Sequence, residues 1–322
     1  MSSMEGNLRW VAVTAIAPVA WGSAYFVTQH LLPAESPLFG AVYRALPAGI
    51  LLLLITRSRP RGSWWWKSAV LGTLNVGTFF ALVYVSAQLL PSSVASTLMA
   101  LSPAVMMLLA WPMLADRPRA LTLVGAAIGI GGVFLLLGAA GGTADLAGVL
   151  ASLAAMTLSS FGFILTKRWN DGGKVLPLTA WQLVAGGLVI LPLAIIVEGA
   201  PPALDPPAIL GFAYLTLIAT AAAYVAWFTG LRHLTAGTVG LIGLLNPVTG
   251  VLLGTAIGGE AFGIPQLIGM VLVLIGILLG QPAESRRRRQ SLFEGTSSAR
   301  CRKRTPERLS SITTNRATRS SR

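Results

Sequence analysis

The sequence predicts an all-α integral membrane protein with ten transmembrane helices, arranged as two five-helix repeats of inverted topology. Three observations support this fold class: an apolar composition, ten apolar segments of membrane-spanning length, and an internal repeat. Hydrophobic residues make up 54% of the 322-residue chain and charged residues 11%, whereas a soluble domain carries about 25% charged residues. The chain lacks the polar surface that water requires, and lipid is the solvent that its composition fits.

Ten segments are apolar enough and long enough to cross about 30 Å of hydrocarbon, which takes roughly 20 helical residues. They are Arg9–Gln29, Pro37–Thr56, Trp65–Ala87, Ser92–Leu114, Arg119–Gly138, Leu146–Thr166, Pro177–Val197, Ile209–Gly230, Thr238–Ile257 and Ile264–Gly280. No small-residue cleavage site followed by a soluble domain comes after the first segment. We therefore expect it to be a retained span and not a signal peptide.

The charges between the spans predict how the chain is oriented. With the N-terminus in the cytoplasm, basic residues fall on the inner side, and they are Arg9, Arg57, Arg59, Arg61, Lys67, Arg117, Arg119, Lys167, Arg168, Lys174 and Arg232. The outer connections carry no Lys or Arg, and their charged residues are all acidic, namely Glu35, Asp145, Glu198, Asp205 and Glu260. This asymmetry obeys the positive-inside rule. It predicts a multi-pass protein of the bacterial inner membrane with both termini in the cytoplasm.

Residues 283–322 form a basic, Ser- and Thr-rich tail that contributes much of the net charge of +13. Its composition predicts a disordered cytoplasmic segment that attracts anionic lipid headgroups. Nucleic-acid binding is disfavoured, because Phe293 is the only aromatic residue among the clustered arginines. Docking of another protein is a third possibility. The single cysteine, Cys301, lies in this tail, so the sequence predicts neither a disulfide framework nor a cysteine-based metal site.

An internal repeat divides the apolar part of the chain into residues 1–141 and 142–282. A shift of 144 residues aligns Ser102-Pro103 with Asn246-Pro247, Asp116 with Glu260, Gly125 with Gly269 and Gly132 with Gly276. A shift of 138 aligns Thr28 with Thr166, Arg44 with Gln182 and Gly49 with Gly187. Five spans is an odd number, so the second copy enters the membrane from the opposite side. Inverted repeats of this kind are typical of secondary transporters that work by alternating access.

Several motifs extend this prediction to a family. They are the run Ala20-Trp21-Gly22-Ser23-Ala24-Tyr25, Arg44 in the second span, the segment from Ala95 to Pro103, and its counterpart from Gly240 to Pro247. With these motifs, residues 8–281 resemble the EamA-type members of the drug/metabolite transporter superfamily. The resemblance implies a ten-helix fold and the export or exchange of amino acids or similar metabolites. One departure is that the second copy has Ser159-Ser160 where the first has Trp21-Gly22, which implies that the two halves are not equivalent in function.

Arg44 is the only Lys or Arg in the interior of a predicted span, since Arg9, Lys67 and Arg119 lie within the first three residues of theirs. Placing an arginine at the centre of a span costs about 2.5–3.5 kcal/mol on insertion scales, so its presence needs a reason. One interpretation is a snorkelling or structural arginine that hydrogen-bonds neighbouring carbonyls. The other is a cation that faces the transport cavity and binds a substrate carboxylate.

Two prolines and several polar or aromatic residues complete the candidate site. Pro103 and Pro247 remove helix hydrogen bonds at symmetric positions, so we expect them to be gating kinks; the alternative is that they only curve their helices around the core. Ser102 and Asn246 stand beside them as candidates to line the substrate cavity. Trp21 and Tyr25 lie one turn apart, and they predict either an aromatic lining for apolar and cationic groups or ordinary core packing. Weaker candidates to line the cavity are Asn75, Tyr84, Gln182 and Tyr224.

Glycines recur at four-residue spacing in Gly125–Gly129, Gly250–Gly254–Gly258 and Gly276–Gly280. This spacing lets helices approach closely. We expect it to serve packing within the chain, with dimerisation through the fifth and tenth spans as the alternative. The sequence leaves open a monomer or a homodimer.

The chemistry that the spans lack narrows the mechanism. No Asp or Glu lies inside a predicted span, which favours facilitated diffusion or exchange over proton coupling. No phosphate-binding P-loop and no zinc or nucleophile–base pattern occurs, so we predict neither an ATP-driven pump nor an enzyme, and no cofactor or metal. The main alternatives to a metabolite carrier are an efflux carrier for drugs or cationic compounds and a membrane receptor that acts through the basic tail.

Overall fold

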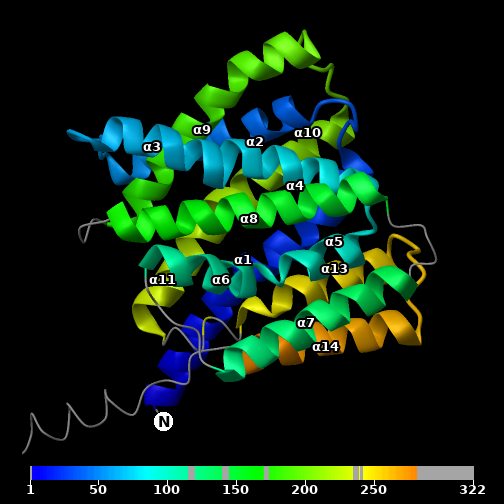
Figure 1. Cartoon of the computed structure of the whole chain (residues 1–322). Coiled ribbons are helices and arrows are strands. Elements are labelled where there is room, and N and C mark those ends of the chain that lie inside the picture. The colour runs from blue at the N-terminus through cyan, green and yellow to red at the C-terminus, as the bar shows by residue number, and fades with distance from the viewer. Residues whose placement is uncertain are drawn as a thin grey trace, which may run out of the picture. The chain divides into compact units, whose positions relative to one another are not determined.

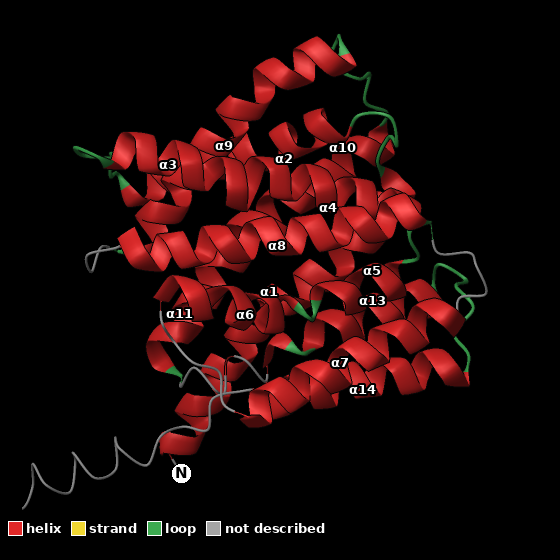
Figure 2. Cartoon of the chain, viewed as in Figure 1, coloured by secondary structure: helices red, strands yellow, loops and turns green. Residues whose placement is uncertain are grey.

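The computed structural model describes residues 2–114, 120–139, 145–169, 174–234, 239 and 242–280. Within these residues all regular structure is helical and no strand occurs (Figure 2). The predicted basic tail and Asp116 lie outside the described residues. The prediction of an all-helical chain is confirmed for the described part.

The helices follow one another with short connections. In chain order they are α1 (Ser2–Leu31), α2 (Pro37–Thr56), α3 (Trp64–Gly72), η1 (Thr73–Gly77), α4 (Thr78–Leu89), α5 (Ser92–Met99), α6 (Ser102–Leu114), α7 (Ala120–Ala139), α8 (Leu146–Trp169), α9 (Val175–Glu198), α10 (Pro206–Ala213), η2 (Tyr214–Ala222), α11 (Ala223–His233), α13 (Leu245–Ala256) and α14 (Ile264–Gly280). The elements η1 and η2 are π-helical. They join their flanking α-helices into longer rods.

Seven helical segments of the described chain are long and apolar enough to cross a membrane. They are Leu8–Leu31, Pro37–Thr56, Trp64–Leu89, Ser92–Met113, Leu146–Thr166, Val175–Glu198 and Pro206–Gly230. Shorter apolar stretches, Leu123–Leu135 and Ile264–Leu279, occur in α7 and α14. The span predicted at 238–257 begins among residues that the structure does not describe. The count of ten spans and their inverted orientation therefore stay predictions.

Two of the predicted spans contain a π-helix where a continuous α-helix was expected. In the third span η1 separates α3 from α4, and in the eighth η2 separates α10 from α11. Such π-helical turns are rare and are found frequently at functional sites. Both lie next to candidate site residues, as described below.

The fourth predicted span is interrupted, and the two candidate prolines lie at helix starts. Helix α5 ends at Met99 and α6 begins at Ser102, which places Pro103 in the first turn of α6. Pro247 occupies the matching place in the first turn of α13. A proline in the first turn removes an N–H that would have no helical partner anyway. The prolines thus start new helices and do not kink continuous ones, and a role in gating stays a prediction.

Helix pairs from the two halves of the chain pack side by side. Helix α7 lies along α14 (Figure 1), and a Cβ at Gly132 would stand only 2.6 Å from the carbonyl oxygen of Gly269. A Cβ at Gly276 would collide in turn with the carbonyl oxygen of Gly125. Close packing within the chain therefore accounts for these glycines.

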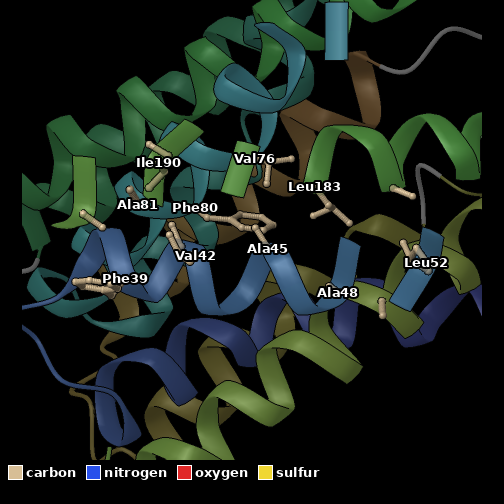
Figure 3. Packing of buried hydrophobic residues seen from close by; sticks show 14 residues of the cluster. Phe39, Val42, Ala45, Ala48, Leu52, Val76, Phe80, Ala81, Leu183 and Ile190 are labelled. Atoms are coloured by element: carbon tan, nitrogen blue, oxygen red, sulfur yellow. The ribbon is translucent and has the colours of Figure 1, made fainter. Parts of the chain in front are cut away.

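Helices α2 and α9 contact each other in the same reciprocal way. A Cβ at Gly49 would stand 2.8 Å from Val184 of α9, and one at Gly187 would stand 2.6 Å from Leu46 of α2. Gly49 and Gly187 are residues that the repeat aligns. The contact belongs to a buried apolar cluster that α2 and α9 share with η1 and α4 (Figure 3).

Candidate functional site

Arg44 of α2 is buried, with 8% of its surface exposed. Its Nε donates a hydrogen bond to Oγ1 of Thr220 at 2.9 Å, and its Nη2 donates to the carbonyl oxygen of Ala219 at 3.4 Å. Both acceptors belong to η2 and lie near the middle of the segment Pro206–Gly230. The guanidinium therefore turns toward the middle of a neighbouring span and does not snorkel to its own helix end.

The aromatic ring of Phe80 covers one face of this guanidinium. The Cζ of Arg44 lies 4.2 Å from the ring centroid, a distance at which a cation is attracted to an aromatic face. Phe80 belongs to α4, and its ring lies next to Ala45 of α2 (Figure 3). The buried apolar cluster thus fixes the ring that holds the arginine.

No carboxylate compensates the charge of Arg44 within the part of the chain that the structure describes. A guanidinium has five N–H donors, and the described residues accept from two of its nitrogens, Nε and Nη2. A buried charge without an opposite charge is costly. The Nη1 edge, which has no acceptor among the described residues, is therefore suited to an anionic group that arrives from outside the protein.

Tyrosines from two helical rods surround the arginine. The hydroxyl groups of Tyr25, Tyr214 and Tyr224 lie within electrostatic range of the guanidinium. The hydroxyl of Tyr214 also shares a 2.6 Å hydrogen bond with that of Ser23. Helix α1 and the rod that contains η2 thereby both present polar groups near Arg44.

Trp21 joins the same group through its ring contacts. Its ring packs edge-on against Tyr224 with centroids 5.9 Å apart, and it lies 5.2 Å from the ring of Trp227. The predicted residues Trp21, Tyr25, Arg44 and Tyr224 are thus brought together. We call this group the arginine–aromatic site, made up of Trp21, Tyr25, Arg44, Phe80, Tyr214, Thr220, Tyr224 and Trp227.

Four members of this site were not identified from the sequence: Phe80, Tyr214, Thr220 and Trp227. Trp227 lies near the end of a predicted span, where tryptophans gather at the membrane interface, and hydroxyls such as that of Thr220 normally bond their own helix. The spacing of Tyr214, Thr220 and Tyr224 along one span is a weak signal. It becomes informative only once that span is known to face Arg44.

Two other candidates, Asn75 and Gln182, form a separate polar cluster. The Nδ2 of Asn75, in η1, donates to Oε1 of Gln182 at 2.8 Å and to Oγ1 of Thr166 at 3.4 Å. Its Oδ1 is buried, has no hydrogen-bond partner in the described part of the chain, and lies against Gly162 of α8. Gln182 and Thr166 are the residues that the repeat aligns with Arg44 and Thr28. In the second half of the chain Gln182 thus contacts the π-helix η1, as Arg44 in the first half contacts η2, but the contact of Gln182 involves no charged group.

Tyr84 and Ser102 make local contacts instead. The hydroxyl of Tyr84 donates to the carbonyl oxygen of Pro33 at 2.6 Å, and its ring packs on Gly40 of α2. The hydroxyl of Ser102 donates to the carbonyl oxygen of Met99 at 2.6 Å, across the break between α5 and α6. The structure does not bring either residue into the arginine–aromatic site.

Asn246 meets the first helix directly after Trp21. A Cβ at Gly22 would collide with the carbonyl oxygen of Asn246 and stand 2.8 Å from Cβ of Thr249. The Oδ1 of Asn246 is buried without a hydrogen-bond partner among the described residues. Gly22 therefore lets α1 and α13 approach closely beside the site, and Asn246 retains an unused acceptor there.

Comparison with known proteins assigns the chain to a family. The model of the EamA-like transporter family matches residues 8–138 and 146–280. Protein PecM of Dickeya dadantii is 37% identical over 268 residues, which cover 82% of this chain and 90% of that protein. The inner membrane transporter YedA of Escherichia coli strain K12 is 28% identical over 269 residues, covering 81% and 87%. The chain belongs to the EamA-like transporter family, within the drug/metabolite transporter superfamily, and is a membrane transporter.

A solved crystal structure supports the fold independently of close sequence similarity. It superimposes with a TM-score of 0.61 at 19% identity and covers 84% of this chain and 98% of the other. At this identity the likeness concerns the fold alone. In the described residues no group of three or more His, Cys, Asp or Glu side chains is placed to hold a metal ion.

Proposed function

We propose that this transporter is a secondary carrier for small metabolites that combine a carboxylate with an apolar part, and that amino acids are its leading substrates. The observation that carries the proposal is the buried guanidinium of Arg44 with no carboxylate partner in the described chain. A substrate carboxylate would supply the missing charge and accept the free N–H donors. Charge-assisted bonds of this kind are about twice as strong as neutral ones.

The aromatic side chains beside Arg44 support an apolar substrate portion. The ring of Trp21 packs against those of Tyr224 and Trp227, with centroids 5.9 and 5.2 Å apart. Aromatic surfaces bind apolar side chains without imposing a strict shape, since the hydrophobic effect is non-directional. A cationic drug would instead meet the positive charge of Arg44 in the same site, so we rank cation efflux below carboxylate transport.

Alternating access between two inverted halves is the mechanism that we propose. It rests on the family membership, on the two matched ranges and on the reciprocal contacts of α2 with α9. In such carriers the site stays fixed near the midplane while one half rocks against the other. The location of Arg44 beside the middle of the segment Pro206–Gly230 fits this arrangement.

Counterflow in proteoliposomes tests the proposal. Vesicles are preloaded with single unlabelled amino acids, and the entry of the labelled amino acid is followed without any energising gradient. We expect wild type to accumulate label, and Trp21→Ala and Arg44→Gln to lose it. Removing one partner of a buried charged pair costs about 2–5 kcal/mol, so we expect the initial rate of Arg44→Gln at low substrate concentration to fall at least about 30-fold.

Arg232→Gln is the matched control, since it removes an exposed arginine at the end of α11. It should transport like wild type. Arg44→Lys keeps the charge but loses the planar fork, and we expect it to recover only part of the activity. Accumulation of no amino acid by folded wild-type protein would refute the amino-acid assignment, and undiminished transport by Arg44→Gln would refute the role of Arg44.

A further inference from the structure

We propose that the π-helix η2 fixes the orientation of the Arg44 guanidinium. Thr220 is the positioning residue, and through it the site selects substrates with a carboxylate over analogues with a neutral carboxamide. This inference rests on the proposed function and deepens it. Thr220 would not touch the substrate. It would act by fixing which edge of the guanidinium the substrate meets.

The hydrogen bonds of Arg44 occupy one particular edge of its guanidinium. Nε and Nη2 form the side edge, and η2 takes both, through Oγ1 of Thr220 and the carbonyl oxygen of Ala219. The two acceptors are consecutive in sequence, so one short stretch of backbone sets the plane of the group. The end edge, formed by Nη1 and the second N–H of Nη2, has no acceptor among the described residues.

A second hydrogen bond fixes η2 against α2 at the neighbouring residue. Oγ1 of Thr216 donates to the carbonyl oxygen of Tyr43 at 2.9 Å. Thr216 and Thr220 are both buried and lie about one turn apart on η2. Helix α2 is thus bonded to η2 at Tyr43 as well as at Arg44, and the bond at Tyr43 holds in place the backbone that carries the arginine.

Phe80 restricts the guanidinium from a third direction. Its ring is buried and stacks over the group at 4.2 Å, which leaves only the opposite face and the end edge for a ligand. An end edge held in a fixed plane suits two parallel N–H···O bonds to a carboxylate. In a carboxamide an NH₂ group replaces one of the two carboxylate oxygens. The carboxamide can therefore accept only one of the two hydrogen bonds, and its NH₂ donors would face the positive guanidinium.

The preference of the carrier for an amino acid over its carboxamide is a readout of this positioning role. A purely structural role of Thr220 would not change that preference. Counterflow of the labelled amino acid is measured with increasing amounts of the unlabelled acid or of its α-carboxamide as competitor. Wild type should prefer the acid strongly. In Thr220→Val the hydroxyl acceptor is lost with almost no change in shape, so the guanidinium is no longer held, and the preference should fall about tenfold, as expected for loss of one hydrogen bond to a charged group.

Two further variants make the comparison specific. Thr220→Ser keeps the hydroxyl and should retain the wild-type preference. Thr229→Val removes a hydroxyl from the same span that donates to the carbonyl oxygen of Val225 in its own helix, and it should leave the preference unchanged. If Thr220→Val does not fold, Thr220→Ala provides the same loss of the hydroxyl with a smaller side chain.

The outcomes separate this inference from the function on which it rests. If wild type accumulates an amino acid but Thr220→Val keeps the full preference for the acid, the positioning role of Thr220 is overturned and the proposed function stands. A rise of the inhibition constants of acid and amide by the same factor would also overturn it, because that indicates general disturbance of the site. If wild type transports no carboxylate at all, both proposals fall.

Discussion

Single residues decide how closely the spans approach one another, and Gly162 is an instructive case. It lies on α8 at the point where Asn75 of η1 crosses, and any Cβ there would collide with Oδ1 of Asn75. The amide of Asn75 cannot retreat easily, because its Nδ2 is bonded to Gln182 and Thr166. A glycine at this position is therefore required by the polar cluster and not by the backbone.

We predict that Gly162→Ala destabilises the protein by about 1–3 kcal/mol, the usual cost of overpacking a filled interior. The measurement is the midpoint of thermal unfolding of the purified protein in detergent. Gly131→Ala is the control, since a Cβ at Gly131 of α7 meets no atom of the described residues within 4 Å. There alanine should be neutral or stabilising by about 0.5–1 kcal/mol. Equal midpoints for the two variants would contradict the packing described for Asn75.

At the scale of elements, acidic side chains from the second half of the chain cap helices of the first. The carboxylate of Glu198, at the end of α9, accepts hydrogen bonds from the backbone N–H groups of Leu38 and Phe39 at 2.6 and 2.9 Å. Glu260 accepts from the N–H groups of Ser92 and Ser93 and from the Ser93 hydroxyl. Negative charge at a helix N-terminus is stabilising, so these carboxylates fasten α2 and α5 to distant parts of the chain.

We predict that Glu260→Ala costs about 0.5–2 kcal/mol, the range for losing an N-terminal cap, and lowers the thermal midpoint accordingly. Asp145→Ala serves as the comparison, because Asp145 caps only its own helix α8, through the N–H groups of Ala147 and Gly148. Both variants lose a cap, but only Glu260→Ala releases a contact between segments 168 residues apart. Protease cleavage in the connection before α5 should therefore increase in Glu260→Ala alone, and equal cleavage in both would count against this fastening.

Elements also show what the sequence can and cannot predict. The bounds of α2 are those expected, because an apolar run with Pro37 at its start and arginines after its end marks a span. The π-helices η1 and η2 and the break between α5 and α6 were not expected, since hydropathy does not distinguish α- from π-helical bonding. Only half of the residues of the arginine–aromatic site were predicted, because hydropathy also does not show which helices face each other. Arg44 and Trp21 stand out as costly or bulky in any span, whereas Thr220 gains its role only from the helix that faces it.

At the scale of the whole molecule, the two halves meet through contacts that are repeated between aligned residues. Gly49 and Gly187 each admit the partner helix, and Gly132 and Gly276 do the same for α7 and α14. Arg44 bonds to η2 while its aligned residue Gln182 bonds to η1. The two halves thus share this helix contact, but one half has a charged guanidinium at the aligned position and the other has a neutral amide. An inverted topology would place Arg44 and Gln182 at different depths of the membrane.

Inverted topology makes a definite prediction about which loops are exposed outside the cell. After Cys301 is replaced by serine, single cysteines are introduced at exposed positions as Glu35→Cys, Ser63→Cys, Ala203→Cys and Arg232→Cys. With the N-terminus inside, Glu35→Cys and Ala203→Cys should react with a membrane-impermeant maleimide in intact cells. Ser63→Cys and Arg232→Cys should react only after the membrane is permeabilised. Glu35 follows the first predicted span and Ala203 follows the seventh. If both cysteines react in intact cells, the chain must cross the membrane an even number of times between them. Labelling of Arg232→Cys in intact cells would contradict that arrangement, and with it the opposed orientation of the two halves on which alternating access depends.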